Sequence, residues 1–176
     1  MNLQKKQKSI FKTSKGFTLV ETLLYVSIIS VMLLVFSVFL FLILQSQVKF
    51  QTISEVDRQG IQVVQALTQT IRNAKKINIP VQGASGATLS VDVVEAAKTP
   101  TVFNSSGSNV QLKEGTDPII SLTASRVTVS GLSFSNVSKN NTPGIIKFQF
   151  TLNYANLSGR NEYNYSKTFY GSAALR

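Results

Sequence analysis

A run of 22 residues without a charged side chain, residues 23–44, constrains the fold of this chain more than any other feature. As an α-helix with a rise of about 1.5 Å per residue, it would span roughly 33 Å, enough to cross a bilayer core of about 30 Å. A cleaved secretory signal has a much shorter apolar region, of about 7 to 15 residues. The sequence therefore predicts a membrane-crossing helix near the N-terminus.

The residues before this run are strongly basic. The first sixteen residues contain no acid and five lysines: Lys5, Lys6, Lys8, Lys12 and Lys15. Lysines before an apolar span favour a cytoplasmic N-terminus, so we expect the residues after the span to lie outside the cytoplasm. Without these sixteen residues the net charge falls from +10 to +5. We interpret the remaining charge as a solvated surface, with nucleic-acid contact as the alternative.

The composition argues against an enzyme. The chain has no Cys and no His, which excludes disulfides, thiol nucleophiles, imidazole bases and the usual zinc sites. Its eight Asp and Glu residues show no paired or metal-like spacing. We therefore predict a non-enzymatic protein with no catalytic residue, no metal and no cofactor.

One acid, Glu21, stands at the start of the apolar run. An ionisable group inside a membrane costs a few kcal/mol or more, so such a residue is a functional hypothesis by default. The alternative is that its side chain reaches out to the lipid headgroups.

The sequence around Glu21 carries a resemblance. Residues 15–21 read Lys-Gly-Phe-Thr-Leu-Val-Glu, which resembles the N-terminal motif of type IV pilins and of the pseudopilins of type II secretion and competence systems. In that family a prepilin peptidase cuts after the glycine and methylates the new N-terminus. The resemblance implies peptidase cleavage between Gly16 and Phe17 and N-methylation of Phe17. It also implies a filament assembly contact at Glu21, which would pair with the terminal ammonium of a neighbouring subunit, poorly screened among apolar helices.

The same resemblance implies partners and a location. The partners would be prepilin peptidase, other pilin or pseudopilin subunits, an inner-membrane assembly platform and membrane lipid. Residues 1–16 would be a cytoplasmic leader, which the peptidase removes. Residues 17–44 would cross the inner membrane once and later form the filament core, in a pilus or pseudopilus.

Beyond residue 44 the pattern becomes amphipathic. Apolar or small residues recur at steps of three and four, which is typical of a helix with one buried stripe: Val56, Gly60, Val63, Val64, Leu67, Ile71 and Ala74. We predict an amphipathic helix over residues 45–79, which ends at Pro80. Gly60 would be a bend, a close-packing point or a glycine that the helix merely tolerates.

The remainder, residues 80–176, is predicted to be a β-rich extracytoplasmic domain. Short alternating segments separated by polar loops indicate an antiparallel sheet, with strands at 89–94, 110–113, 119–122, 127–134, 145–154 and 163–170. The expected fold class is thus α+β, with a long N-terminal helix packed on an antiparallel sheet.

Residues 127–176 contain a strand with a Gly-Leu-x-Phe step, a long alternating strand, a polar loop and a final strand that ends Tyr-Gly-Ser-Ala-Ala-Leu-Arg. This order is similar to minor pilins of the PilW kind and to J-type pseudopilins, and the resemblance favours a minor subunit. Two alternatives stay open. One is an uncleaved single-pass membrane protein with an external β-domain. The other is a DNA-binding minor subunit of a competence filament, in which an aromatic and basic surface would bind single strands. That surface would comprise Tyr154, Tyr163, Tyr165, Phe169, Tyr170, Lys147, Arg160 and Lys167.

Overall fold

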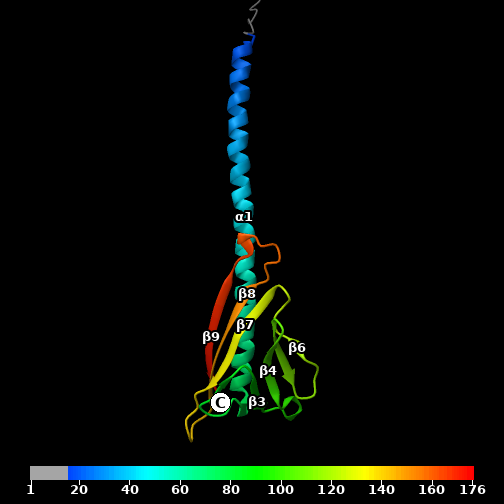
Figure 1. The fold of residues 1–176 in the computed structure, drawn as a ribbon, viewed down its shortest axis with the longest axis vertical. Coiled ribbons are helices and arrows are strands. Elements are labelled where there is room, and N and C mark those ends of the chain that lie inside the picture. The colour runs from blue at the N-terminus through cyan, green and yellow to red at the C-terminus, as the bar shows by residue number, and fades with distance from the viewer. Residues whose placement is uncertain (1–15) are drawn as a thin grey trace, which may run out of the picture. The chain divides into compact units, whose positions relative to one another are not determined.

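The computed structural model describes residues 16–176 and divides into two units, one ending at Ile43 and the other comprising Leu44–Arg176. Helix α1, Leu19–Arg72, is 54 residues long and contributes to both units. It is the long helix in Figure 1, blue at its N-terminal end and green at its C-terminal end. The predicted α+β class is confirmed, because the second half of this helix packs on antiparallel strands.

The first unit exposes its apolar side chains. From Leu19 to Leu44 every large hydrophobic side chain of α1 is exposed, and among the described residues this is the one helix long and apolar enough to cross a membrane. Its hydroxyl groups do not remain unsatisfied. Ser27, Ser30 and Ser37 each donate to a backbone carbonyl three or four residues earlier, all at 2.8 Å. Such bonds lower the cost of placing hydroxyls in hydrocarbon.

The second unit uses one face of α1 as part of its core. The predicted stripe is confirmed at Val56, Gly60, Val63, Leu67 and Ile71, which are buried, and Val64 is partly buried beside them. Two polar residues of the same face, Thr52 and Gln59, are buried as well, and apolar periodicity gave no sign of either.

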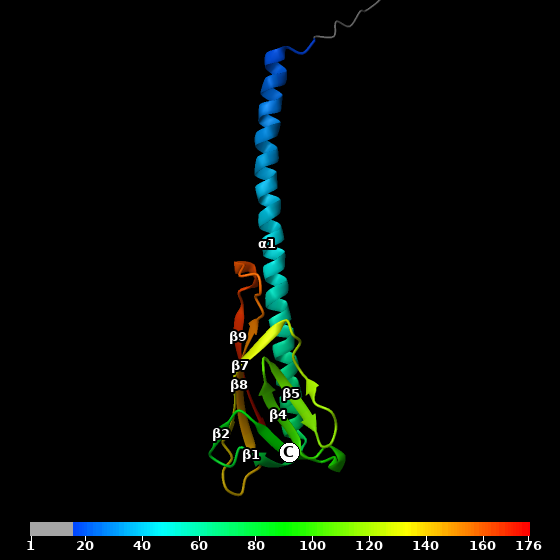
Figure 2. The ribbon, with the colours of Figure 1, turned by 45° about the vertical axis from the view of Figure 1, so that its right-hand side comes forward.

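Nine strands and two short 3-10 helices follow in this unit, and every paired strand is antiparallel (Figures 1 and 2). The five-stranded sheet has the order β1-β3-β4-β5-β6: β1 Ala74–Ile79, β3 Leu89–Val93, β4 Thr101–Ser106, β5 Asn109–Glu114 and β6 Ile120–Ser121. The four-stranded sheet has the order β2-β7-β8-β9: β2 Ser85–Gly86, β7 Val127–Asn136, β8 Ile145–Tyr154 and β9 Ser166–Ala174. The 3-10 helices are η1 Ala96–Lys98 and η2 Asn161–Tyr163.

Strand β8 shows why the sequence pattern predicted this sheet well. Its even-numbered residues Ile146, Phe148, Phe150 and Leu152 are buried, whereas the residues between them are exposed or partly exposed. This is the two-residue period of a strand with one face on a core. The observed bounds match the predicted range 145–154, because the alternation continues for the whole strand.

The helix ends earlier than predicted. The range 45–79 is wrong at its C-terminal end, since α1 stops at Arg72 and residues from Ala74 form β1. Ladder pairing decides this boundary: Ala74 lies opposite Val93, and Ile77 lies opposite Val91. Ala-Lys-Lys is a sequence of good helix formers, but its local preference is a fraction of a kcal/mol per residue and tertiary pairing overrides it. The β-rich part therefore begins at residue 74 and not at residue 80.

The prediction of one antiparallel sheet is wrong, because the strands form two sheets. Strands β1, β2 and β4 were not predicted. Residues 104–109 lie between two predicted strands and contain only Asn, Ser and Gly, a composition that indicates a loop. Most of this segment nevertheless belongs to the hairpin of β4 and β5, in which Phe103 pairs with Leu112 and Ser106 with Asn109. Only Gly107 and Ser108 form the turn, where Gly107 has a φ of +59° that favours glycine. Ser and Asn are weak strand formers, so their sequence alone suggested a loop.

Candidate functional site

The segment that precedes α1 is accessible and is not helical. Gly16, Phe17 and Thr18 lie outside the helix, and all three are exposed. A Cβ added to Gly16 would meet no atom within 4 Å, so the space around this residue is open. The bond between Gly16 and Phe17 therefore lies in a stretch of backbone that an enzyme can reach without unwinding a helix. Residues 1–15 of the predicted leader lie outside the described residues.

Thr18 caps the helix. Its hydroxyl oxygen accepts a hydrogen bond from the backbone N–H of Glu21 at 3.3 Å, and its carbonyl accepts the bond from the N–H of Thr22 at 3.1 Å. A Thr followed three residues later by Glu is the sequence pattern of a capping box. This local chemistry fixes the start of α1 two residues after the Gly16–Phe17 bond.

Glu21 lies in the first turn of α1 and is exposed. A carboxylate in the first turn is stabilised by the positive end of the helix dipole. The hydroxyl of Tyr25, one turn later, donates to Glu21 Oε1 at 3.2 Å, and the ring of Tyr25 meets the ring of Phe17 edge to face, with centroids 5.8 Å apart. Sequence analysis did not single out Tyr25, although its four-residue spacing from Glu21 is the available signal.

Gly16, Phe17 and Glu21 thus lie at one end of α1, with Tyr25 contacting both Phe17 and Glu21. Within residues 16–176 the carboxylate accepts one side-chain hydrogen bond, at Oε1. Its two oxygens have further acceptor positions, which suit a cation such as an ammonium group. Cleavage at Gly16, methylation of Phe17 and the assembly contact of Glu21 remain predictions.

The proposed nucleic-acid surface is divided by the fold. Phe169 is buried, with its ring stacked on that of Phe150 at a centroid distance of 5.4 Å. Tyr154 and Tyr163 stack on each other at 5.8 Å, whereas Tyr170 is exposed on the outward face of β9, the edge strand of its sheet. The aromatic residues of this set therefore do not form one continuous platform.

Two of the three cations of that set already have acidic partners. Lys167 Nζ lies 2.9 Å from Asp57 Oδ1, and this hydrogen-bonded carboxylate raises the pKa of the lysine. Arg160 lies 2.9 Å from Glu162 Oε1, a hydrogen bond that lowers the pKa of the Glu162 carboxyl. These ion pairs reduce the positive charge that a nucleic acid would meet.

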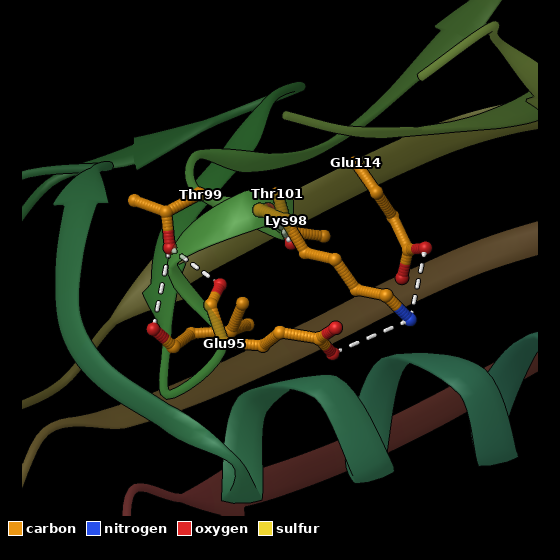
Figure 3. A network of polar contacts seen from close by, with 6 residues as sticks. Glu95, Lys98, Thr99, Thr101 and Glu114 are labelled. Atoms are coloured by element: carbon orange, nitrogen blue, oxygen red, sulfur yellow. Dashed lines mark hydrogen bonds and ion pairs between the residues drawn. The ribbon is translucent and has the colours of Figure 1, made fainter. Parts of the chain in front are cut away.

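A cluster of polar side chains surrounds η1 (Figure 3). Lys98 Nζ lies 3.5 Å from Glu114 Oε2 and 3.7 Å from Glu95 Oε2, and these two carboxylates raise the pKa of Lys98, Glu114 more than Glu95. The hydroxyl of Thr101 donates to the carbonyl of Lys98 at 2.7 Å. The cluster ties η1 to β5 and β4, so its evident role is to order this connection.

Metal binding finds no support in residues 16–176, where no three Asp or Glu side chains gather closely enough to hold an ion. Comparisons of the chain with protein-family models, with curated proteins and with solved structures gave no match.

Proposed function

We propose that this protein is a minor pilin or pseudopilin subunit, which prepilin peptidase processes and which takes part in assembling or priming a type IV pilus or a type II secretion pseudopilus. One observation carries the proposal: the ordered motif of residues 15–21 directly precedes a membrane-length helix. The non-helical backbone at Gly16 and Phe17 supports it, because a peptidase needs an extended substrate.

The roles of the three site residues follow from their chemistry. Hydrolysis of the bond after Gly16 would leave a carboxylate on Gly16 and a free amine on Phe17. The unprotonated amine would take a methyl group from an electrophilic methyl donor, and the methylated amine would carry a positive charge at neutral pH. Glu21, four residues later, would accept the ammonium of a neighbouring subunit inside the bundle of apolar helices. Such a pair is poorly screened, so it fixes register even where its net stabilisation is small.

The second unit would then stay outside the cytoplasm and present the sheet surfaces of the filament. Before assembly the chain would be a single-pass inner-membrane protein, in agreement with the one membrane-length helix of the described residues. The scarcity of acid–base residues supports a structural role rather than an enzymatic one.

The decisive experiment is co-expression with a prepilin peptidase, followed by intact-mass measurement and N-terminal sequencing. We expect a chain that begins at methylated Phe17. The variant Gly16→Ala should retain its leader, whereas the matched control Gly86→Ala, which changes a glycine with open space around it, should be processed normally. An intact leader under conditions that process a known prepilin would overturn the proposal and leave an uncleaved membrane anchor.

A further inference from the structure

The second unit has an aromatic and basic surface beside its first helical turns, close in sequence to the apolar run. A groove of about 840 Å³ is lined by side chains of α1 and by three residues of the sheet region: Val48, Phe50, Gln51, Thr52, Ser54 and Glu55 from the helix, with Arg126, Tyr154 and Tyr163. The connection between β8 and β9, residues 155–165, therefore lies beside the N-terminal turns of α1 in this unit, as both views show (Figures 1 and 2). Two further residues adjoin this groove without lining it. Leu157 follows Ala155, whose backbone N–H donates to the carbonyl of Arg126 at 2.9 Å, and the charge of Lys49 acts on the carboxylate of Glu162, next to Tyr163. We call Lys49, Phe50, Arg126 and Leu157, with the two tyrosines, the Leu157 patch.

Leu157 is presented by an ordered turn. Asn156 Nδ2 donates to the carbonyl of Arg160 at 2.9 Å, and the hydroxyl of Ser158 donates to Asn156 Oδ1 at 3.3 Å. This bonded turn leaves the side chain of Leu157 100% exposed, and Phe50 on the groove wall is 71% exposed. A single exposed apolar residue needs no explanation. Phe50 and Leu157 together with the stacked tyrosines form an apolar surface that also carries the tyrosine hydroxyl groups. Aromatic residues of this kind are common at membrane interfaces.

The patch has an excess of positive charge. The carboxylates that face it are Glu55 and Glu162, and each forms an ion pair with an arginine, Arg58 and Arg160 respectively. Within residues 16–176 neither Lys49 nor Arg126 has a carboxylate within 4.0 Å. Two cations of the patch thus lack a direct ion-pair partner, and only the longer-range charges of Glu162 and Glu55 act on Lys49 and Arg126. With the exposed Phe50 and Leu157, this arrangement suits an anionic and partly apolar partner.

The chain keeps this patch close to the membrane surface. The apolar run ends at Leu44, and Phe50 follows six helical residues later, a rise of about 9 Å. The headgroup layer on each side of a bilayer core is roughly 5 to 8 Å thick. Phe50 therefore lies about 9 Å beyond the hydrocarbon edge, near the outer boundary of the headgroup layer, when α1 crosses the bilayer.

We propose that the Leu157 patch docks the second unit on the headgroup layer of the bilayer that α1 enters, with anionic phospholipid as its ligand. Leu157 and Phe50 enter the interface, and Lys49 and Arg126 contact lipid phosphates. The inference rests on the membrane-anchored state in the proposed function, and it needs neither peptidase cleavage nor filament assembly. Docking would hold the subunit in one orientation until it leaves the membrane.

The test uses the full chain, which contains no cysteine and so accepts a single label. Ser158→Cys places an environment-sensitive fluorophore beside Leu157. Asn140→Cys is the control, in the connection at the other end of the ten-residue strand β8, about 30 Å away. Both proteins are reconstituted into vesicles of phosphatidylcholine and phosphatidylglycerol in a ratio of 3:1, which include a lipid with a headgroup nitroxide. Co-flotation with the vesicles first establishes that α1 is anchored.

We expect the nitroxide to quench the label at position 158 at least threefold more than the label at 140. Quenching at 158 should fall by half or more with Leu157→Asn, with Lys49→Gln/Arg126→Gln, and in vesicles of phosphatidylcholine alone. The matched pair Lys113→Gln/Lys139→Gln, which removes the same charge elsewhere, should leave it unchanged.

Equal quenching at 158 and 140 in a co-floating protein would overturn the proposal. So would quenching that is indifferent to phosphatidylglycerol and to the two cations. Protection of the label only at high protein density, with disulfide cross-links between unlabelled Ser158→Cys copies on addition of an oxidant, would instead assign the patch to a contact between subunits and overturn the proposal. Failure to co-float would count against membrane anchoring itself, and cleavage is measured separately.

Discussion

The ring of Phe169 on β9 lies so close to Gly60 of α1 that a Cβ on this glycine would overlap three of the ring carbons. The same ring stacks on Phe150, nearly parallel to it at an interplanar angle of 17°. Gly60 is therefore a close-packing point between the helix and the four-stranded sheet, one of the roles predicted for it. Phe169, a candidate ligand-binding residue by sequence, is part of the core.

Gly60→Ala should destabilise the second unit by about 1 to 2 kcal/mol net. The added methyl group meets the Phe169 ring, and overpacking of this kind costs more than the roughly 1 kcal/mol that alanine gains in helix propensity. The free energy of unfolding is measured by urea titration of the full chain in detergent, followed by tyrosine near-UV circular dichroism. Phe169→Leu in the Gly60→Ala background should recover part of the loss, and Gly86→Ala should change little. A stabilised Gly60→Ala variant would contradict this packing.

Gln59 joins the helix to the segment before β7, because its Oε1 accepts a hydrogen bond from the backbone N–H of Ala124 at 2.9 Å. Gln59→Leu should lower the free energy of unfolding by about 1 to 3 kcal/mol, since it leaves a part-buried N–H without a partner. The exposed residue Gln65 on the same helix provides the control Gln65→Leu. If both substitutions had equally small effects in urea titrations, the hydrogen bond would contribute nothing measurable.

Acidification should weaken the second unit through Glu55. Hydrogen bonds from Arg58 and then Gln59 hold the pKa of this carboxyl below the ordinary value of 4.5. The unfolded chain therefore binds a proton at a higher pH than the folded chain. The stabilisation is complete above the unfolded pKa and is lost as the pH falls from near 4.5 through the folded pKa. Urea midpoints from pH 7 to pH 3 should fall less steeply for Glu55→Gln than for the wild type. Equal slopes would exclude Glu55 as a source of the pH dependence.

Glu21→Gln should separate processing from assembly. The amide keeps the size of the side chain but loses the charge, so the peptidase should still cut after Gly16. Removal of one partner of a buried ion pair costs several kcal/mol, and we expect incorporation into sheared filaments to fall at least about tenfold. Immunoblots of the sheared and membrane fractions measure this ratio. Tyr25→Phe, which removes only the 3.2 Å hydrogen bond to Glu21, is the control and should assemble nearly normally. Normal incorporation of Glu21→Gln would remove the proposed assembly role.

Local patterns predicted several elements correctly. The helix stripe around Val63 and Leu67 followed from its period. Strand β8 was predictable over its full length for the same reason, since one face alternates without interruption. The start of α1 at Leu19 lies two residues from the predicted start at residue 17, and the capping pattern of Thr18 and Glu21 is a local signal that the prediction did not use. In each case neighbouring residues carry the signal, so no distant contact is needed to recognise it.

Other features depend on residues far apart in the chain. The end of α1 is set by the pairing of β1 with β3, and the division into two sheets depends on which strands pair with one another. Lys167 pairs with Asp57 across 110 residues, which changes a candidate surface cation into a link between strand and helix. The sequence alone determined the membrane-length helix, its cap and the motif of residues 15–21, because these are local. Only tertiary structure decided that Phe169 is core and that Leu157 is exposed, because burial depends on which distant segments pack over a residue.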